Sequence, residues 1–189
     1  MTTITPTRIV DGVAVPAIGT WDIDKAHSKV EFVARHLMIT KVRGSFEEYD
    51  GTIVVADDPA ASSIDITLQA GSITTGSADR DGHLRSPDFL DVENFGTVRY
   101  RADRVERTGD GWLARGELTI KDVTRPVDLP FEFLGVTTDP WGNAKAGFEA
   151  RTAIDREDFG LTWNVALESG GVLVSKKVTI EIGLQLHQG

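Results

Sequence analysis

Apolar and polar residues alternate through most of this chain, and that period of two constrains its fold more than any other feature. In the last stretch, Val178, Ile180 and Ile182 alternate with Thr179 and Glu181. Such alternation is typical of antiparallel strands with one buried and one solvated face. It predicts strands over 30–36, 42–46, 62–70, 97–105, 111–120, 125–133, 145–155 and 177–187.

Turn-forming residues separate these strands, at 57–59, 108–111, 139–143 and 169–171. The spacings make successive strands hairpin neighbours. Helical signal is confined to 78–85, where Ser77 could cap the first turn, and to 155–159. Eight or nine strands in a meander favour an all-β up-and-down barrel, with a β-sandwich as the alternative.

Length and charge restrict what such a barrel does. The chain has 189 residues, which fits one domain, with 1–18 as an N-terminal lead-in (extended or a short hairpin) and 19–189 as the barrel domain. Its 20 Lys and Arg against 29 Asp and Glu give a net charge of −9, which argues against a nucleic-acid partner. The chain has no cysteine, so disulfides and thiolate metal sites are excluded.

The N-terminal residues lack the apolar run of a secretory signal, since Asp11, Gly12 and Pro16 interrupt the apolar residues there. No stretch approaches the ~20 apolar residues of a membrane-spanning helix. From these features we expect a cytoplasmic protein without an integral membrane segment.

Small residues occupy many positions on the predicted inner face. They either leave space for a ligand or make room for large side chains opposite them, and the sequence favours neither interpretation. An eight-stranded barrel is just wide enough to hold one small ligand. The small inward residues are Ala34, Gly44, Ala102, Ala114, Gly116, Ala146 and Ala150.

Two polar clusters have the residue types of catalytic sites. Asp24, His27 and Ser28 are those of a hydrolytic triad, but all three fall within five residues, which favours turn bonds to the backbone. The adjacent carboxylates of Glu157 and Asp158 suggest a glycosidase only weakly, because adjacent residues on a surface turn are a poor basis for a catalytic pair.

The densest polar stretch covers 80–91 and contains Asp81, His83 and Asp88, which have the chemistry of metal ligands. Asp81 and His83 are two residues apart, which does not place them on one helix face. A helical lid with internally paired charges is therefore preferred, and no metal site is predicted. A metal-dependent enzyme that uses these three residues remains the least favoured function.

A third cluster is basic. His36 shares its strand face with Phe32, so it is expected to point toward the lumen at one mouth of the barrel, close to Lys41 and Arg43. Cations at that place could hold an anionic head group. His36 and Arg43 are therefore head-group candidates.

The motifs, taken in order, resemble those of the YceI-like, polyisoprenoid-binding, lipocalin-like family. The opening Trp21-x-Ile23-Asp24-x-x-His27-Ser28 is similar to the start of its domain, and Val42-x-Gly44-x-Phe46 follows. The stretch from Arg80 to Asp91 is similar to its most specific signature. Further matches are Gly116-x-Leu118-Thr119-Ile120, Val123-Thr124-Arg125-Pro126-Val127 and Arg156-x-Asp158-Phe159-Gly160-Leu161.

The resemblance implies an extended eight-stranded antiparallel lipocalin-like β-barrel with one or two short helices at its mouth. It implies non-enzymatic carriage or storage of a long apolar isoprenoid lipid, such as a polyprenyl chain or an isoprenoid quinone, with no cofactor. A stress-response module that sequesters another small amphiphile, a fatty acid or fatty amide, is the alternative. A homodimer is compatible with either function. The expected ligand contacts are Phe32, Ala34, His36, Val42, Phe46, Phe89, Tyr100, Phe131, Phe148, Phe159 and Trp163.

Overall fold

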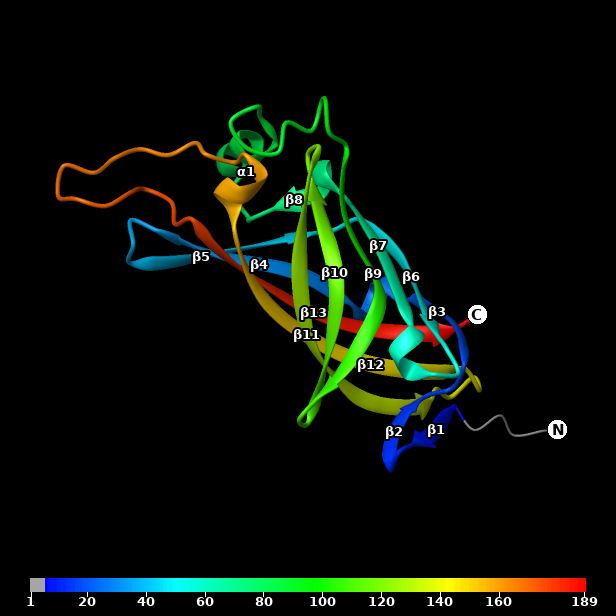
Figure 1. Ribbon diagram of the computed structural model, residues 1–189. Helices are drawn as coiled ribbons and strands as arrows, with labels where there is room; N and C mark the ends of the chain where they lie inside the picture. Colours follow the sequence, from blue (N-terminus) through cyan, green and yellow to red (C-terminus); the bar gives the residue numbers. More distant parts are fainter. Residues whose placement is uncertain (1–5) are drawn as a thin grey trace.

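A closed antiparallel barrel of eight strands forms the body of the computed structural model, which describes residues 6–189 (Figure 1). The eight strands lie around the barrel in chain order, and the last strand pairs with both β12 and β3, which closes the sheet. They are β3 (Gly19–Ile23), β6 (Tyr49–Val55), β7 (Ser63–Gln69), β9 (Thr97–Thr108), β10 (Gly111–Ile120), β11 (Val123–Thr138), β12 (Ala144–Asp155) and β13 (Lys177–Gln188).

Three further strands widen the barrel at one end. β4 (Lys29–His36) follows β3 along the same edge of β13, with the 3₁₀ turn η1 (Lys25–His27) between the two. β5 (Thr40–Phe46) pairs with β4, and β8 (Ile73–Thr74) pairs with β5. The all-β barrel expected from the alternation is thereby confirmed.

The short helices lie at the widened end. α1 (Ala78–Arg85) and the 3₁₀ turn η4 (Arg156–Phe159) match the two helical signals in the sequence. They lie above the barrel opening in Figure 1. Arg85 anchors α1, because its guanidinium donates to the carbonyls of Gly71 (2.8 Å) and Ile73 (2.7 Å). Two further 3₁₀ turns are η2 (Pro59–Ala61) and η3 (Ala70–Ser72).

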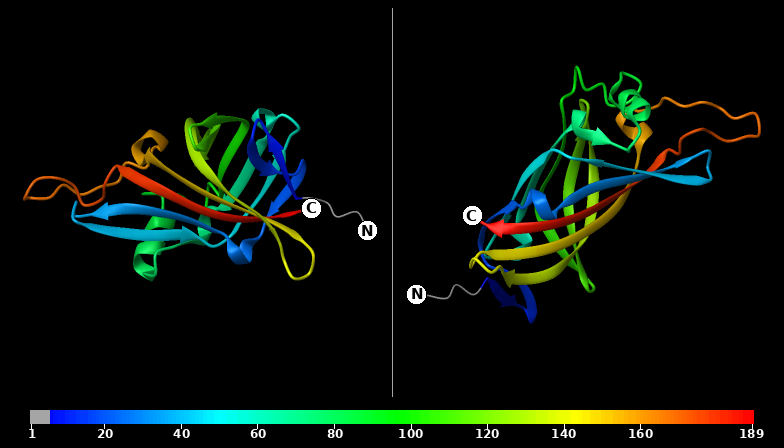
Figure 2. Two further views of the ribbon diagram at one scale, coloured as in Figure 1. Left: turned by 90° about the horizontal axis from the view of Figure 1, so that it is seen from below. Right: turned by 180° about the vertical axis from the view of Figure 1, so that it is seen from behind.

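The first described residues form a two-stranded hairpin of β1 (Thr7–Val10) and β2 (Val13–Pro16). It lies at the opposite end of the barrel from α1 (Figures 1 and 2). Arg8 fastens it to the barrel by donating to the carbonyls of Asp57 (2.7 Å) and Ala56. Within residues 6–189, no helix has the length and apolar character needed to cross a bilayer.

Two strands lack the period of two. β6 contains Gly51 and the unbroken apolar run of Ile53, Val54 and Val55, so it does not alternate cleanly. β3 is too short, at five residues, for alternation to be seen. β11 is longer than expected, because a bulge at Gly135 shifts the register and allows pairing with β12 to continue.

Candidate functional site

The interior of the barrel holds two cavities with apolar walls. The lower cavity, of about 100 Å³, lies at the end where the β1–β2 hairpin contributes to its wall. The upper cavity, of about 200 Å³, lies beneath α1. Ile66, Leu129 and Ile182 belong to the walls of both, so the cavities lie end to end along the barrel axis. We call these three residues the neck.

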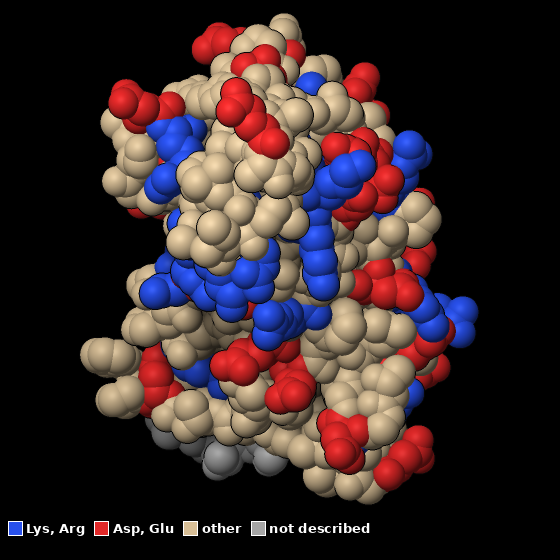
Figure 3. All heavy atoms as spheres, turned by 90° about the vertical axis from the view of Figure 1, so that its left-hand side faces the viewer, with Lys and Arg blue, Asp and Glu red and all other residues tan. Residues whose placement is uncertain are grey.

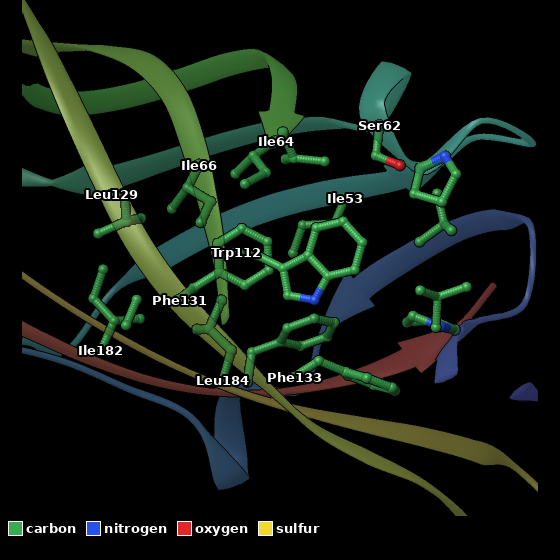
Figure 4. Close-up of a pocket in the computed structure, with 17 residues that line it drawn as sticks. Ile53, Ser62, Ile64, Ile66, Trp112, Leu129, Phe131, Phe133, Ile182 and Leu184 are labelled. Carbon is green, nitrogen blue, oxygen red and sulfur yellow. The ribbon is translucent and has the colours of Figure 1, made fainter. Parts of the chain in front are cut away.

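The lower cavity is lined mainly by branched aliphatic and aromatic side chains (Figure 4). Among residues 6–189 its wall has 17 members, of which Ser62 is the one that is not apolar. The Ser62 hydroxyl already accepts the amide N–H of Ala56 (3.1 Å). The rings of Trp112 and Phe131 stack at 6.4 Å between centroids. The side-chain hydrogen-bond donors in this wall are the Ser62 hydroxyl and the Trp112 indole N–H, and the described residues that line it carry no charge.

The β1–β2 hairpin contributes to the lower cavity. Val15, only 3% exposed, and Pro16 are part of its wall. The sequence pattern separates 1–18 from the barrel domain and allows this segment to bind a partner instead. The structure places its β2 strand against the inner surface of the barrel.

The upper cavity is covered by α1 and the loop that follows it. Leu84, Phe89 and Leu90 from this segment form part of the wall. Phe89 packs edge-on against His83 (centroids 5.1 Å apart), and His83 packs against Trp163 (4.5 Å). The predicted helical lid is thus present, and it is fixed by aromatic contacts.

Arg156 is the one basic residue that residues 6–189 contribute to the walls of these two cavities, and it is only 4% exposed. Its guanidinium donates to the carbonyls of Ser175 (3.0 Å), Leu161 (2.5 Å) and Val174 (3.4 Å). Burial lowers the pKa of Arg156, and the nearby charges of Glu157 and Asp155 oppose that shift. A guanidinium has five N–H donors, and these bonds use three of them.

Most of the predicted contact residues line a cavity. Phe32, Ala34, Phe46, Phe89 and Tyr100 line the upper cavity, and Phe131 and Phe148 line the lower one. The Tyr100 hydroxyl donates to the carbonyl of Val127 (3.0 Å), and burial raises the pKa of this phenol. That these residues contact a ligand stays a prediction.

The other predicted contacts lie elsewhere. Phe159, 2% exposed, packs in the core beside the upper cavity, and Trp163 packs on the lid. Val42 and His36 are outside both walls, because β4 and β5 extend beyond the barrel at this point. His36 instead forms an isolated bridge with Val174.

Arg43 requires a correction. It alternates with Val42 and Gly44, and its register partner is Val33, so its side chain is on the outer face of the sheet. There the guanidinium binds Glu181 of β13 at 2.5 Å. Because successive residues of a strand point to opposite faces, Arg43 points away from the lumen. Its position does not support the predicted role as a head-group ligand.

Some of the small inward residues leave space in a cavity, and others make room for a large side chain opposite them, so both interpretations from the sequence apply. Ala34 and Ala150 line cavities. Gly44 and Gly116 instead make room for the rings of Phe32 and Tyr100, because a Cβ at either glycine would overlap the ring. Whether a small residue leaves space therefore depends on its cross-strand neighbour.

The triad-like cluster is structural. The Asp24 carboxylate caps η1 by accepting the Ala26 N–H, and it also binds His27 (3.2 Å), Lys145 (3.0 Å) and Gln185 (3.3 Å). These contacts, led by the hydrogen bond from Lys145, lower the pKa of Asp24 to about 2. The Ser28 hydroxyl donates to the Gln185 carbonyl and accepts its N–H. Asp24 thus makes the expected turn bond, whereas Ser28 binds the backbone of β13 and not of its own turn.

Asp81, His83 and Asp88 do not converge. The buried Asp81 carboxylate accepts the Thr75 N–H (2.8 Å) and the Thr74 hydroxyl (3.2 Å), contacts that lower its pKa against the opposing effect of burial. His83 binds Asp88 at 2.8 Å. In the part of the chain that the structure describes, no group of three His, Asp or Glu residues could hold a metal ion.

Several wall residues belong to the alternating pattern but not to the predicted contacts. They lie on β10, β11 and β13 and include Leu118, Ile120, Leu129, Ile180 and Ile182. The pattern does indicate the inward parity of Ile180 and Ile182, since they alternate with Thr179 and Glu181. Arg156 gives no such signal, because a basic residue beside three carboxylates is typical of a solvated turn.

Comparison with known proteins gives a consistent result. The family model for the YceI-like domain matches residues 21–186. A UPF0312 protein of Serratia proteamaculans is 36% identical over 155 residues, which cover 80% of this chain and 81% of that protein. A UPF0312 protein of Pectobacterium atrosepticum is 35% identical over 162 residues, which cover 85% and 84% of the two chains.

Solved structures share the fold. BcnA of Burkholderia cenocepacia has a TM-score of 0.74 at 20% identity, covering 87% of this chain and 99% of that one. The YCEI protein of Campylobacter jejuni has a TM-score of 0.70 at 26% identity, covering 82% and 90%. A polyisoprenoid binding domain from Saccharophagus degradans has a TM-score of 0.66 at 15% identity, covering 92% and 100%.

Proposed function

The chain belongs to the YceI-like family, and from that premise we propose that it binds a long apolar isoprenoid lipid in its lumen. A polyprenyl chain or an isoprenoid quinone would lie along the axis of the barrel, through the neck. The protein would carry or store this lipid and would catalyse no reaction on it.

The observation that carries the proposal is the pair of end-to-end apolar cavities. Burial of hydrocarbon is worth roughly 0.8 kcal/mol for each CH₂ group removed from water. A chain-shaped ligand would gain this free energy along both cavities, whereas a compact ligand would fill only one of them. The two cavities meet at Ile66, Leu129 and Ile182, so the space is extended rather than round.

Arg156 supports a ligand with a polar end. Its buried guanidinium belongs to the wall of the upper cavity and uses three of its five N–H donors in the bonds to backbone carbonyls. A quinone carbonyl or another oxygen acceptor would accept a hydrogen bond there, whereas a pure hydrocarbon would not. Among the described residues that line the lower cavity, the side-chain donors are the Ser62 hydroxyl and the Trp112 indole, which are both uncharged, so we place the polar end in the upper cavity and the tail in the lower one.

The similarity to a domain described as polyisoprenoid binding supports the same ligand class, although at 15% identity it concerns the fold alone. The cytoplasmic location and the homodimer stay predictions. Fractionation of the native host and sedimentation of the purified protein would test them.

Native mass spectrometry tests the proposed function, with organic extraction of protein purified from its own host. We expect an apolar ligand with a mass ladder of five-carbon units. Recovery of a fatty acid or fatty amide would instead support the alternative of a module that sequesters another amphiphile. Protein that carries no apolar molecule, and binds none when titrated with an isoprenoid quinone, would refute both.

A further inference from the structure

One part of the molecule projects beyond the barrel. It consists of the β4–β5 hairpin over residues 35–43 and the loop 162–177, which we call the arm. The two segments extend together, away from the barrel, in every ribbon view (Figures 1 and 2). They are joined by backbone bonds from Leu37 N–H to Leu173 (2.8 Å) and from Ser175 N–H to Arg35 (3.0 Å).

The tip of the arm is apolar and exposed. Leu37, Met38 and Ile39 are 40%, 50% and 75% exposed, and Val165 from the adjoining loop is 46% exposed. Single exposed apolar residues are common on protein surfaces, but three consecutive ones at the end of a projection, with a fourth on the adjoining loop, are not.

The backbone makes this tip unusual as well. Leu37 and Met38 have φ of +53° and +60°, in a turn closed by the bond from Ile39 N–H to the His36 carbonyl. Two-residue turns of this kind favour Asn-Gly, because bulky residues are strained at positive φ. The chain thus holds two large apolar residues where small polar ones would be more stable, a pattern typical of functional positions.

Basic residues surround the tip. The arm contains Arg35, Lys41, Arg43, Lys176 and Lys177 against the single acid Glu168, although the whole chain has a net charge of −9. Figure 3 faces the arm and shows an uncharged area with Lys and Arg below it and at its sides and with acidic residues at its upper edge. Among the described residues, Arg35, Lys41 and Lys177 form no ion pair within 4 Å.

From the apolar tip and its basic border we propose that the arm docks the protein on an anionic lipid bilayer. The side chains of Leu37, Met38 and Ile39 would enter the interface between head groups and acyl chains. The basic residues would meet the negative head groups. Apolar residues combined with Lys and Arg at one surface give this mode of peripheral binding.

The position of the arm makes docking useful to a lipid carrier. Ala34 on β4 and Val174 on the loop are at its base, and both belong to the wall of the upper cavity. The docked tip would therefore bring the cavity close to the bilayer. Docking itself does not depend on the lumen ligand, so the two proposals can fail separately.

The positive charge of the arm favours an anionic bilayer over a second copy of this chain as its partner. The same face on another copy is also basic, because Arg35, Lys41 and Lys177 form no ion pair among the described residues, while Arg43 and Lys176 pair with Glu181 and Glu157, so two arms would repel each other. The opposite end also exposes an apolar residue, Trp141, which is 84% exposed. Its loop 138–143 contains Asp139 and neither Lys nor Arg, so it lacks the basic border.

Flotation of the full chain with vesicles tests the docking. We expect binding to vesicles of phosphatidylglycerol and phosphatidylcholine, weak binding to phosphatidylcholine alone, and loss of binding at high salt. The double variant Leu37→Asn with Met38→Gly removes the apolar tip and supplies the residues that suit the turn, so the fold is retained. Its affinity should fall by at least about tenfold.

Two further variants make the test specific. Lys41→Gln and Lys177→Gln should each weaken binding on the order of fivefold. Trp141→Ser removes an exposed apolar residue from the other end and should leave binding unchanged. The proposal would be overturned if the Leu37→Asn, Met38→Gly variant bound anionic vesicles as tightly as the wild type. It would also be overturned if the wild type bound neutral vesicles as tightly as anionic ones, or if Trp141→Ser abolished binding. A dimer in solution that the double variant abolishes would overturn it as well, because the tip would then be an interface between copies.

Discussion

The ring of Phe32 on β4 lies against the backbone of Gly44, its register partner on β5. A Cβ atom at position 44 would stand 2.7 Å from Cε1 of the ring and 2.9 Å from the backbone carbonyl of Thr74. Phe32 and its neighbour Phe46 (ring centroids 6.1 Å apart) both line the upper cavity. The glycine therefore determines how an aromatic residue is placed in the lumen wall.

Gly44→Ala is expected to destabilise the protein by about 1–3 kcal/mol, because the added methyl group overpacks a site with a backbone carbonyl on one side. Urea unfolding measures this change. Gly183→Ala on β13 is the matched control, because a Cβ there meets nothing within 4 Å. Equal stability of the two variants would show that the Phe32–Gly44 contact does not limit the site.

Ile182→Trp is expected to block the neck. A larger side chain there would separate the two cavities and leave each of them accessible. Titration with isoprenoid quinones of increasing tail length measures the effect: affinity for long tails should drop by at least about tenfold, while that for the shortest tail should hardly change. Glu181→Gln on the outer face is the control. A uniform loss for all tail lengths would argue against a ligand that passes through the neck.

Val15→Asp is expected to loosen the β1–β2 hairpin, since it places a carboxylate against an apolar cavity. The hairpin loses the burial of a Val side chain, worth roughly 1.5–3 kcal/mol. A bound lipid should dissociate faster through the lower end, as stopped-flow exchange would measure. Ala14→Asp adds the same charge to the exposed neighbouring position. If both variants release lipid at the wild-type rate, the hairpin does not close the lumen.

Asp24 should make stability dependent on pH in the acid range. Its pKa of about 2 in the folded protein is below its ordinary value of 3.8. The carboxylate therefore stabilises the fold fully above pH 3.8, and this contribution is lost as the pH falls from 3.8 toward 2. After allowance for solvent screening we expect about 1 kcal/mol.

Comparison of wild type with Asp24→Asn in urea unfolding at several pH values measures this contribution. The difference should be present near neutral pH and should shrink below pH 3.8. A difference that stays the same from neutral pH down to about pH 2.5 would mean that the charge of Asp24 is not responsible.

Arg156→Lys should be strongly destabilising despite the retained charge. An ammonium cannot reach the carbonyls of Leu161, Val174 and Ser175 with the geometry of a guanidinium. Unpaired buried carbonyls cost about 1–3 kcal/mol each, so we expect a loss of at least about 2 kcal/mol in urea unfolding. Lys176→Gln, on the exposed side of the same region, removes a charge without such bonds. A loss no larger than that of the control would contradict the bracing role of Arg156.

The alternation of residues was enough to predict the barrel class and most of its strands, because the period of two follows directly from the geometry of a strand with one buried face. It also predicted which side of β4 bears Phe32, Ala34 and His36. It did not reveal β6, in which Ile53, Val54 and Val55 interrupt the period.

Whether an inward-facing residue lines a cavity or is covered by another side chain depends on residues from other strands. Gly44 and Ala34 are both small and share the inner face, yet the space at Gly44 is taken by the Phe32 ring, whereas Ala34 lines a cavity. The surroundings of Arg43 and Arg156 likewise could not be predicted from the local sequence. One is exposed and pairs with Glu181 on the outer face, while the other is buried at the lumen wall by a turn whose composition suggests a solvent-exposed site.

The sequence by itself determined an antiparallel barrel with a helical lid, since local alternation and turn residues specify strands and hairpins. Only the tertiary structure decided where the lumen is open, where the β1–β2 hairpin contributes to its wall, and how the turn at Leu37 comes to lie beside Leu173. These features depend on contacts between residues that are far apart in the chain, such as Arg35 and Ser175, which are separated by 140 positions. A local pattern carries no information on such contacts, because it indicates on which face of a strand a side chain lies but not which side chains from other strands lie next to it.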